Sequence, residues 1–214
     1  MICVSIAEPD FDRCKSMLDK EDFAEIRIDA TRFTPEQIKE LFSTNVKTIA
    51  TCRPGQHGTL ERTKLLAAAI KAGACYVDIE YESDKEYRNQ LVELANKAGC
   101  TVIISYHDYE KTPTPIELNN IAESSLTMGA EVIKVACMVN QKSDLLALLS
   151  LYQRTERVVA IGMGPEGILS RILAPALGAE FTFAAPDNGK PTAPGQITKS
   201  EMKRLIHEID SLKH

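Results

Sequence analysis

A lysine inside an apolar run is the residue best placed for covalent chemistry. Lys134 lies in VIKVA (132–136), whose β-branched neighbours are typical of a buried strand. Strand lysines often protect exposed sheet edges, but a closed barrel has no edge, so there Lys134 must point inward. Burial disfavours the charged ammonium form, and a neutral amine is the nucleophile that imine chemistry requires. Lys134 is therefore a candidate for covalent catalysis, and an edge-protecting lysine is the alternative.

A histidine stands at the end of the preceding strand-like run, TVIISYH (101–107). Ser105 and His107 are two residues apart, so both side chains point to one side of the predicted strand. Histidine has an unperturbed pKa of about 6.5 and can move protons near neutral pH. His107 is thus a candidate general acid and base, although a histidine at a strand end can also be an ordinary hydrogen-bonded residue.

Charged residues alternate in two further runs, where buried parallel strands should be apolar. Glu25, Arg27 and Asp29 share one side of EIRIDA, and Asp78 and Glu80 share one side of VDIEY. Charges that point into a barrel must pair with each other or meet a polar ligand. The pattern indicates either an internal ion-pair network or a binding site for a charged substrate.

A glycine-rich loop follows the seventh strand-like run. The segment from Gly162 to Gly167 matches GxGxxG, and Asp187 lies twenty residues after it, as in a dinucleotide fingerprint. Only one predicted strand follows this loop, whereas a dinucleotide-binding fold needs several. In a barrel, the backbone N–H groups of the same loop can bind an anion, and we favour that interpretation.

Eight strand-like runs, each followed by a helical pattern, position these residues. The strands are predicted at 2–7, 24–30, 46–52, 75–81, 101–107, 131–137, 157–163 and 181–185. Capping residues and left-handed C-terminal glycines mark helix ends at Thr34, Thr114, Gly73, Gly99, Gly129 and Gly178. Pro175 should bend or end the seventh helix. The last helix should bury one apolar face, formed by Met202, Leu205, Ile206, Ile209 and Leu212.

This order of elements predicts an α/β fold, a compact (β/α)8 TIM barrel, with an open doubly wound sheet as the alternative. No linker or low-complexity segment interrupts the chain, so residues 1–214 are interpreted as a single barrel domain. No apolar run approaches the ~18–20 residues of a membrane span, and the first residues do not resemble a signal peptide. The net charge of −5 without a basic block argues against nucleic acid. We therefore expect a cytoplasmic protein without membrane or nucleic-acid partners.

The six cysteines form no CxxC pair and no Cys/His cluster with the spacing of metal ligands. Several lie in apolar runs, where cysteine usually acts as a small buried hydrophobic residue. We expect reduced thiols and no metal site.

Seven segments, taken in order over nearly all of the chain, resemble the type I 3-dehydroquinate dehydratases, the Schiff-base class of the shikimate pathway. They are EIRID at Glu25, TCRP at Thr51, VDIE at Val77, SYHDY at Ser105, IKVA at Ile133, MGPEGILSR at Met163 and APGQ at Ala193. The resemblance implies a (β/α)8 barrel, usually a homodimer, that uses no metal or organic cofactor. It also implies dehydration of 3-dehydroquinate, a carboxylated cyclic substrate, to 3-dehydroshikimate.

The resemblance further implies roles for individual residues. Lys134 matches the imine-forming lysine, His107 the general acid and base, and Arg171 the arginine that binds the substrate carboxylate. The other substrate-binding positions are Glu25, Arg27, Arg53, Thr192 and Gln196, of which the last two belong to a loop that covers the substrate.

Three features depart from the family pattern. Met1 stands almost directly before the first strand, so we expect no N-terminal β-hairpin to close the bottom of the barrel. Thr192 replaces the usual serine, and His57 stands in the place of a glutamate that can assist the catalytic histidine. We expect Glu80, with Asp78 second, to orient His107, and we expect His57 to lie at the pocket mouth.

Two other functions remain open. Another barrel lyase, such as an aldolase acting on a phosphorylated sugar, would use the same Lys134 imine and bind phosphate at the glycine loop. In a non-enzymatic binding protein, the inward charges would only satisfy one another. Arg171 and the APGQ loop favour the carboxylated ring.

Overall fold

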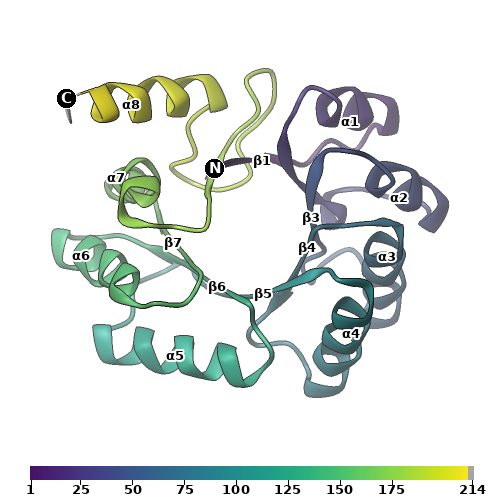
Figure 1. The fold of residues 1–214 in the computed structure, drawn as a ribbon, viewed down its shortest axis with the longest axis horizontal. Coiled ribbons are helices and arrows are strands. Elements are labelled where there is room, and N and C mark those ends of the chain that lie inside the picture. The colour runs from purple at the N-terminus through teal and green to yellow at the C-terminus, as the bar shows by residue number, and fades with distance from the viewer. Residues whose placement is uncertain (212–214) are drawn as a thin grey trace.

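The computed structural model describes residues 1–211 and shows a ring of parallel strands surrounded by helices (Figure 1). The strand order is β7-β6-β5-β4-β3-β2-β1-β8, so the last strand lies beside the first. Within the described residues the strands are β1 (Ile2–Ile6), β2 (Phe23–Arg27), β3 (Lys47–Thr51), β4 (Tyr76–Glu80), β5 (Thr101–Asp108), β6 (Val132–Met138), β7 (Val158–Met163) and β8 (Thr182–Ala184). This order confirms the (β/α)8 barrel and is inconsistent with an open doubly wound sheet.

Helices alternate with the strands and cover the outside of the ring. In residues 1–211 the α-helices are α1 (Phe11–Leu18), α2 (Pro35–Phe42), α3 (Thr59–Ala72), α4 (Lys85–Ala98), α5 (Pro115–Thr127), α6 (Lys142–Ser150), α7 (Ile168–Leu173) and α8 (Lys199–Ser211). Short 3-10 turns are η1 (Ile28–Ala30), η2 (Leu151–Gln153), η3 (Pro165–Gly167) and η4 (Ala174–Leu177). No helix of this part of the chain is long and apolar enough to cross a membrane.

The helix boundaries follow the local chemistry that the sequence indicates. Thr34 and Thr114 form capping boxes at the starts of α2 and α5. Gly73 and Gly99 end α3 and α4 in the left-handed region, with φ of 111° and 69°. The helix α7 ends immediately before the turn that contains Pro175.

The apolar face of α8 packs as predicted over the described residues. Met202 is buried, and Leu205, Ile206 and Ile209 pack against the same cluster. Leu212, the remaining predicted member of this face, lies outside the described residues.

The strand β2 is shorter than predicted. It ends at Arg27, and Ile28–Ala30 form a 3-10 turn in which Asp29 accepts from the Arg27 guanidinium with both carboxylate oxygens, at 3.0 and 2.7 Å. The expectation of three charges along one strand face is therefore wrong at Asp29. Only Glu25 and Arg27 reach the central cavity.

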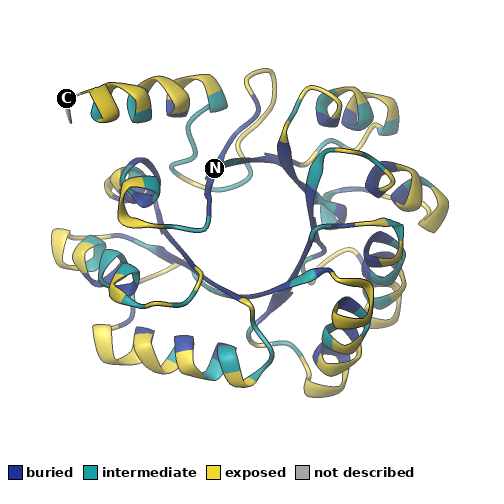
Figure 2. Ribbon diagram, in the orientation of Figure 1, coloured by how far each residue is buried: buried dark blue, intermediate teal, exposed yellow. Residues whose placement is uncertain are grey.

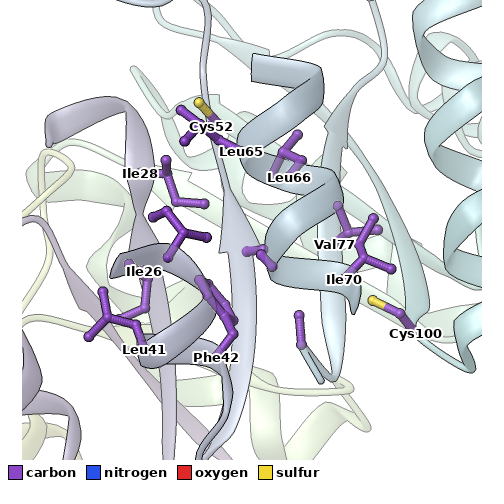
Figure 3. Close-up of a cluster of buried hydrophobic side chains, with 14 of the residues drawn as sticks. Ile26, Ile28, Leu41, Phe42, Cys52, Leu65, Leu66, Ile70, Val77 and Cys100 are labelled. Carbon is purple, nitrogen blue, oxygen red and sulfur yellow. The ribbon is translucent and has the colours of Figure 1, made fainter. Parts of the chain in front are cut away.

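Most of the apolar core lies between the strand ring and the helices. Figure 2 shows buried strands, with helices that are exposed on their outer faces. Figure 3 shows one part of this layer, in which Ile26 and Ile28 lie near Leu41 and Phe42 of α2. This layer fixes the strands, and it leaves the inside of the ring to a different set of side chains.

Aromatic side chains fill the inside of the barrel at the amino ends of its strands. The rings of Phe23, Tyr76 and Phe181 pack with centroids 5.1 to 5.7 Å apart. The Tyr76 hydroxyl donates to Glu180 at 3.0 Å. Within the described residues these rings fill the amino end of the barrel interior.

Candidate active site

A cavity of about 480 Å³, its open mouth included, lies at the carboxyl ends of the strands. It brings together all eight residues that were predicted to act on or bind the substrate: Glu25, Arg27, Arg53, His107, Lys134, Arg171, Thr192 and Gln196. The other lining residues are Tyr109, Ala136, Ile161, Met163, Phe183 and Ala193. Barrel enzymes place their chemistry at this end, where loops of several βα units converge.

Lys134 lines the cavity, and the residue is 5% exposed. Its Nζ donates to Asp78 Oδ2 at 2.8 Å and lies 3.8 Å from Glu25 Oε1. The Phe183 ring centroid is 4.5 Å away. These two carboxylates compensate the charge of the amine, which burial alone would disfavour.

Asp78 is the counter-ion at the centre of the cluster, behind the cavity wall. Its Oδ1 accepts from Ser105 Oγ at 2.5 Å and lies 2.9 Å from Arg53 Nη2. Burial works to raise the pKa of Asp78, but Arg53 and Lys134 outweigh it and hold that pKa well below its ordinary value. Asp78 therefore stays negative and orients both cations.

His107 lies on β5, beside the strand that carries Lys134. Burial lowers the pKa of His107 well below its ordinary value, and the positive charges of Arg53 and Lys134 lower it further. Its ring stacks on Tyr109 with centroids 6.2 Å apart. At neutral pH the imidazole is therefore uncharged and available as a base.

Glu80 was expected to orient His107, but in the structure its carboxylate binds two arginines instead. Both oxygens of Glu80 accept from arginines: Oε1 from Arg53 at 3.0 Å and Oε2 from Arg62 at 2.5 Å. Asp78 is instead the carboxylate whose charge acts on His107 and raises its pKa against the larger effects. The Glu80 carboxylate is unavailable because an arginine from the outer helix layer holds it.

His57 also lies elsewhere than expected. Its Nε2 is 3.0 Å from the Thr31 carbonyl oxygen, and its Nδ1 is 3.2 Å from Glu61 Oε1. It does not line the central cavity. One partner follows the 3-10 turn η1 and the other lies in the first turn of α3, so the ring is held away from the pocket mouth.

Glu25 is held by hydroxyl groups that the sequence analysis did not single out. Its Oε1 accepts from Thr51 Oγ1 at 2.9 Å, and its Oε2 accepts from Ser5 Oγ. Hydroxyls within buried strands depart from the apolar pattern just as Lys134 does, so the same criterion could have found Ser5 and Thr51.

Arg171 is a buried cation at the cavity wall, 1% exposed. Its Nη2 donates to the Pro194 carbonyl at 3.4 Å, and its Nε has no partner. No carboxylate pairs with it within residues 1–211, and burial lowers its pKa to about 10. It remains protonated at neutral pH, so an anionic ligand would complete its environment.

The loop that carries Thr192 and Gln196 folds over this side of the cavity. Gln196 Oε1 accepts from the Thr192 backbone N–H at 2.7 Å, and Thr192 Oγ1 donates to Ser5 Oγ at 2.8 Å. The loop is therefore hydrogen-bonded to β1.

The glycine-rich loop packs against this covering loop. A Cβ on Gly195 would lie 2.5 Å from the Gly164 carbonyl oxygen, and the Gly164 N–H donates to Pro194. The amides of Gly162 and Gly167 also donate within the protein. These glycines permit close approach of backbone segments, which does not support the expected use of their amides for anion binding.

Two further kinds of chemistry to consider are metal binding and thiol reactivity. Within residues 1–211, no group of three His, Cys, Asp or Glu side chains is arranged to hold a metal ion. Burial raises the pKa of the Cys14, Cys52, Cys100 and Cys137 thiols to about 12, so these thiols are unreactive at neutral pH.

Comparisons with known proteins agree with the geometry. The family model of type I 3-dehydroquinase matches residues 2–213. A 3-dehydroquinate dehydratase of Methanococcus maripaludis strain S2 is 35% identical, covering 98% of this chain and 100% of its own length. One of Methanocaldococcus jannaschii is 34% identical, covering 98% and 99%.

Solved structures show the same barrel. The Aquifex aeolicus 3-dehydroquinate dehydratase has a TM-score of 0.82 at 28% identity, covering 97% of this chain and 98% of its own. The type I enzyme of Clostridium difficile has a TM-score of 0.86 at 23% identity, covering 98% and 92%.

Proposed function

The chain belongs to the type I 3-dehydroquinase family, and on that premise we propose that it dehydrates 3-dehydroquinate through an imine on Lys134, with His107 as acid and base. One observation carries the proposal. The Arg171 guanidinium, which no carboxylate of the described residues binds, faces the same cavity as the Lys134 amine and the neutral His107 ring. A substrate with one carboxylate and one ketone matches these groups.

In the first step, Lys134 attacks the ketone carbon, and the carbonyl oxygen leaves as water. The ammonium must first lose a proton, which the uncharged His107 imidazole can accept. His107 then returns this proton to the carbinolamine hydroxyl, which leaves as water, so the ring is neutral again before the second step. The iminium carries the same single positive charge as the ammonium, so Asp78 and Glu25 compensate it without rearrangement.

In the second step, His107 removes a proton from the carbon beside the iminium. The electron pair moves toward the iminium nitrogen, which gives an enamine. The enamine then expels the hydroxyl group one carbon further away, and the His107 imidazolium protonates it as it leaves. Water hydrolyses the product imine and returns Lys134 as the free amine.

The remaining cavity residues position the ring. Arg171 offers a planar pair of N–H donors to the carboxylate. Arg53, Arg27 and Glu25 offer donors and acceptors to ring hydroxyls, while Thr192 and Gln196 cover the opening and exclude water.

Neither alternative function receives comparable support. The glycine-loop amides that a sugar-phosphate aldolase would use for phosphate donate within the protein instead. The relatives that match over full length are named as enzymes, which disfavours a protein that only binds. A homodimer, a cytoplasmic location and a single-domain chain remain predictions.

The test is turnover of 3-dehydroquinate, followed by the ultraviolet absorbance of the conjugated enone product. Borohydride added during turnover should reduce the imine and attach one ligand mass to the peptide that contains Lys134. Lys134→Ala should remove the adduct and lower turnover by roughly 10⁴-fold or more, since the covalent route is lost. An adduct on another lysine would refute the assignment.

A further inference from the structure

Arg62 is a buried charge that the proposed mechanism does not use. It lies in the first turn of α3, in the helix layer outside the strand ring, and is 6% exposed. It does not line the central cavity. A buried guanidinium outside a cavity requires partners, and those of Arg62 lead directly toward the substrate site.

The Arg62 side chain holds the ends of two neighbouring strands. Its Nε donates to the Cys52 carbonyl at 2.8 Å, at the residue directly before Arg53. Its Nη2 donates to Glu80 Oε2 at 2.5 Å. The Tyr87 ring lies 4.9 Å from the guanidinium carbon and fixes its plane. One side chain therefore restrains both the backbone before Arg53 and the carboxylate that binds Arg53.

The contacts continue into the cavity as charges of alternating sign. Glu80 Oε1 accepts from Arg53 Nη1 at 3.0 Å. Arg53 Nη2 lies 2.9 Å from Asp78, and Asp78 binds Lys134 at 2.8 Å. We call the series Arg62–Glu80–Arg53–Asp78–Lys134 the ion-pair chain.

We propose that Arg62 is a positioning residue for the dehydratase reaction, acting through Glu80 and Cys52 to hold the Arg53 guanidinium in its substrate-binding orientation. This inference rests on the proposed function of Arg53. Without Arg62, Glu80 keeps a single cation and the Cys52 carbonyl loses its donor, so both restraints that Arg62 places on Arg53 relax together, while Asp78 and Ser105 still bind its guanidinium.

The first measurement is steady-state kinetics of Arg62→Met and Arg62→Lys. Lysine keeps the positive charge, but a single ammonium lacks the fork that reaches Cys52 and Glu80 together. We expect KM for 3-dehydroquinate to rise about tenfold in the methionine variant and less in the lysine variant, with kcat changed by less than about threefold. If the methionine variant does not fold, the lysine variant carries the test.

Arg88 provides a matched control. It is a buried arginine of the next helix, it donates to the Ser83 carbonyl at 2.8 Å, and it lies outside the ion-pair chain. Arg88→Met should lower stability and leave KM unchanged. If the Arg62 variants behave like the Arg88 variant, with lower stability but unchanged KM, Arg62 is only structural and the inference is wrong.

A double-mutant cycle tests whether Arg62 acts through Arg53. In an Arg53→Met background, Arg62→Lys should change KM by less than about twofold, because the group that it positions is gone. Additive effects of the two substitutions would overturn the inference.

The pH profile supplies a further readout. Arg53 is one of the charges that lower the pKa of His107, after burial, together with Lys134 and Arg27, and Asp78 opposes them. If Arg53 moves away in Arg62→Met, the acidic limb of kcat/KM should shift to higher pH. An unshifted limb together with unchanged KM would leave Arg62 without a role in the site. Failure of the proposed function would appear differently, as absence of turnover in the unmodified protein.

Discussion

The two ends of the barrel interior are filled by opposite kinds of side chain. At the amino ends of the strands, Phe23, Tyr76 and Phe181 pack ring against ring. At the carboxyl ends, Lys134 and Asp78 pair within a network of charges. Aromatic burial stabilises a fold directly, whereas a buried ion pair gains little after its desolvation. Stability should therefore depend on the aromatic end, and catalysis on the charged end.

The largest expected effect lies at the charged end. His107→Ala should lower kcat by roughly 10²–10⁴-fold, because His107 is the one histidine among the described residues that line the cavity. Borohydride should still trap a slowly formed adduct on Lys134. A variant with kcat near that of the unmodified protein would remove His107 from the proposed mechanism.

The aromatic end should respond in the opposite way. Phe181 is fully buried, so Phe181→Ala should lower the free energy of unfolding by about 3–5 kcal/mol, measured by urea denaturation. The kcat of the folded fraction should stay within about twofold. As a control, Phe181→Leu should cost less than half as much stability. A large loss of kcat without loss of stability would contradict the division between the two ends.

Arg171→Lys should have a smaller, purely kinetic effect. The charge is kept but the paired N–H donors are lost, so KM should rise about tenfold with little change in the free energy of unfolding. An unchanged KM would show that the substrate carboxylate binds elsewhere in the cavity.

The smallest expected effect concerns the pH dependence of kcat/KM. His107 acts as a base only when neutral, and its lowered pKa keeps it neutral below the usual histidine range. The acidic limb of kcat/KM should therefore lie below pH ~6.5, and it should be unchanged in Phe181→Leu. A limb at or above pH 6.5 would mean that the charges around His107 do not act as described.

The sequence predicts the residues of the site better than their pairing. Lys134 and His107 stand out because polar side chains in buried strands are rare, and that criterion needs no tertiary information. The pairing of Lys134 with Asp78 joins strands that are not neighbours, so it depends on the curvature of the sheet into a barrel. The expectation that Glu80 orients His107 is wrong for a similar reason. Glu80 binds Arg62 of α3, and the sequence of this helix does not indicate that an arginine side chain contacts the ends of two strands. The orientation of the His57 side chain toward the Thr31 carbonyl depends on loop geometry, which local sequence patterns do not determine.

The position of the last strand has a consequence for how the chain reaches this structure during synthesis. Ile2 of β1 pairs with Thr182 of β8, so one edge of the first strand has no partner until a segment about 180 residues later has been made. Until then the nascent chain can hold at most an open sheet with unpaired backbone along β1, which invites association with other chains. Such contacts between distant segments also slow folding. Because Arg171, Thr192 and Gln196 come from segments on either side of β8, the substrate cavity is completed only when β8 pairs with β1.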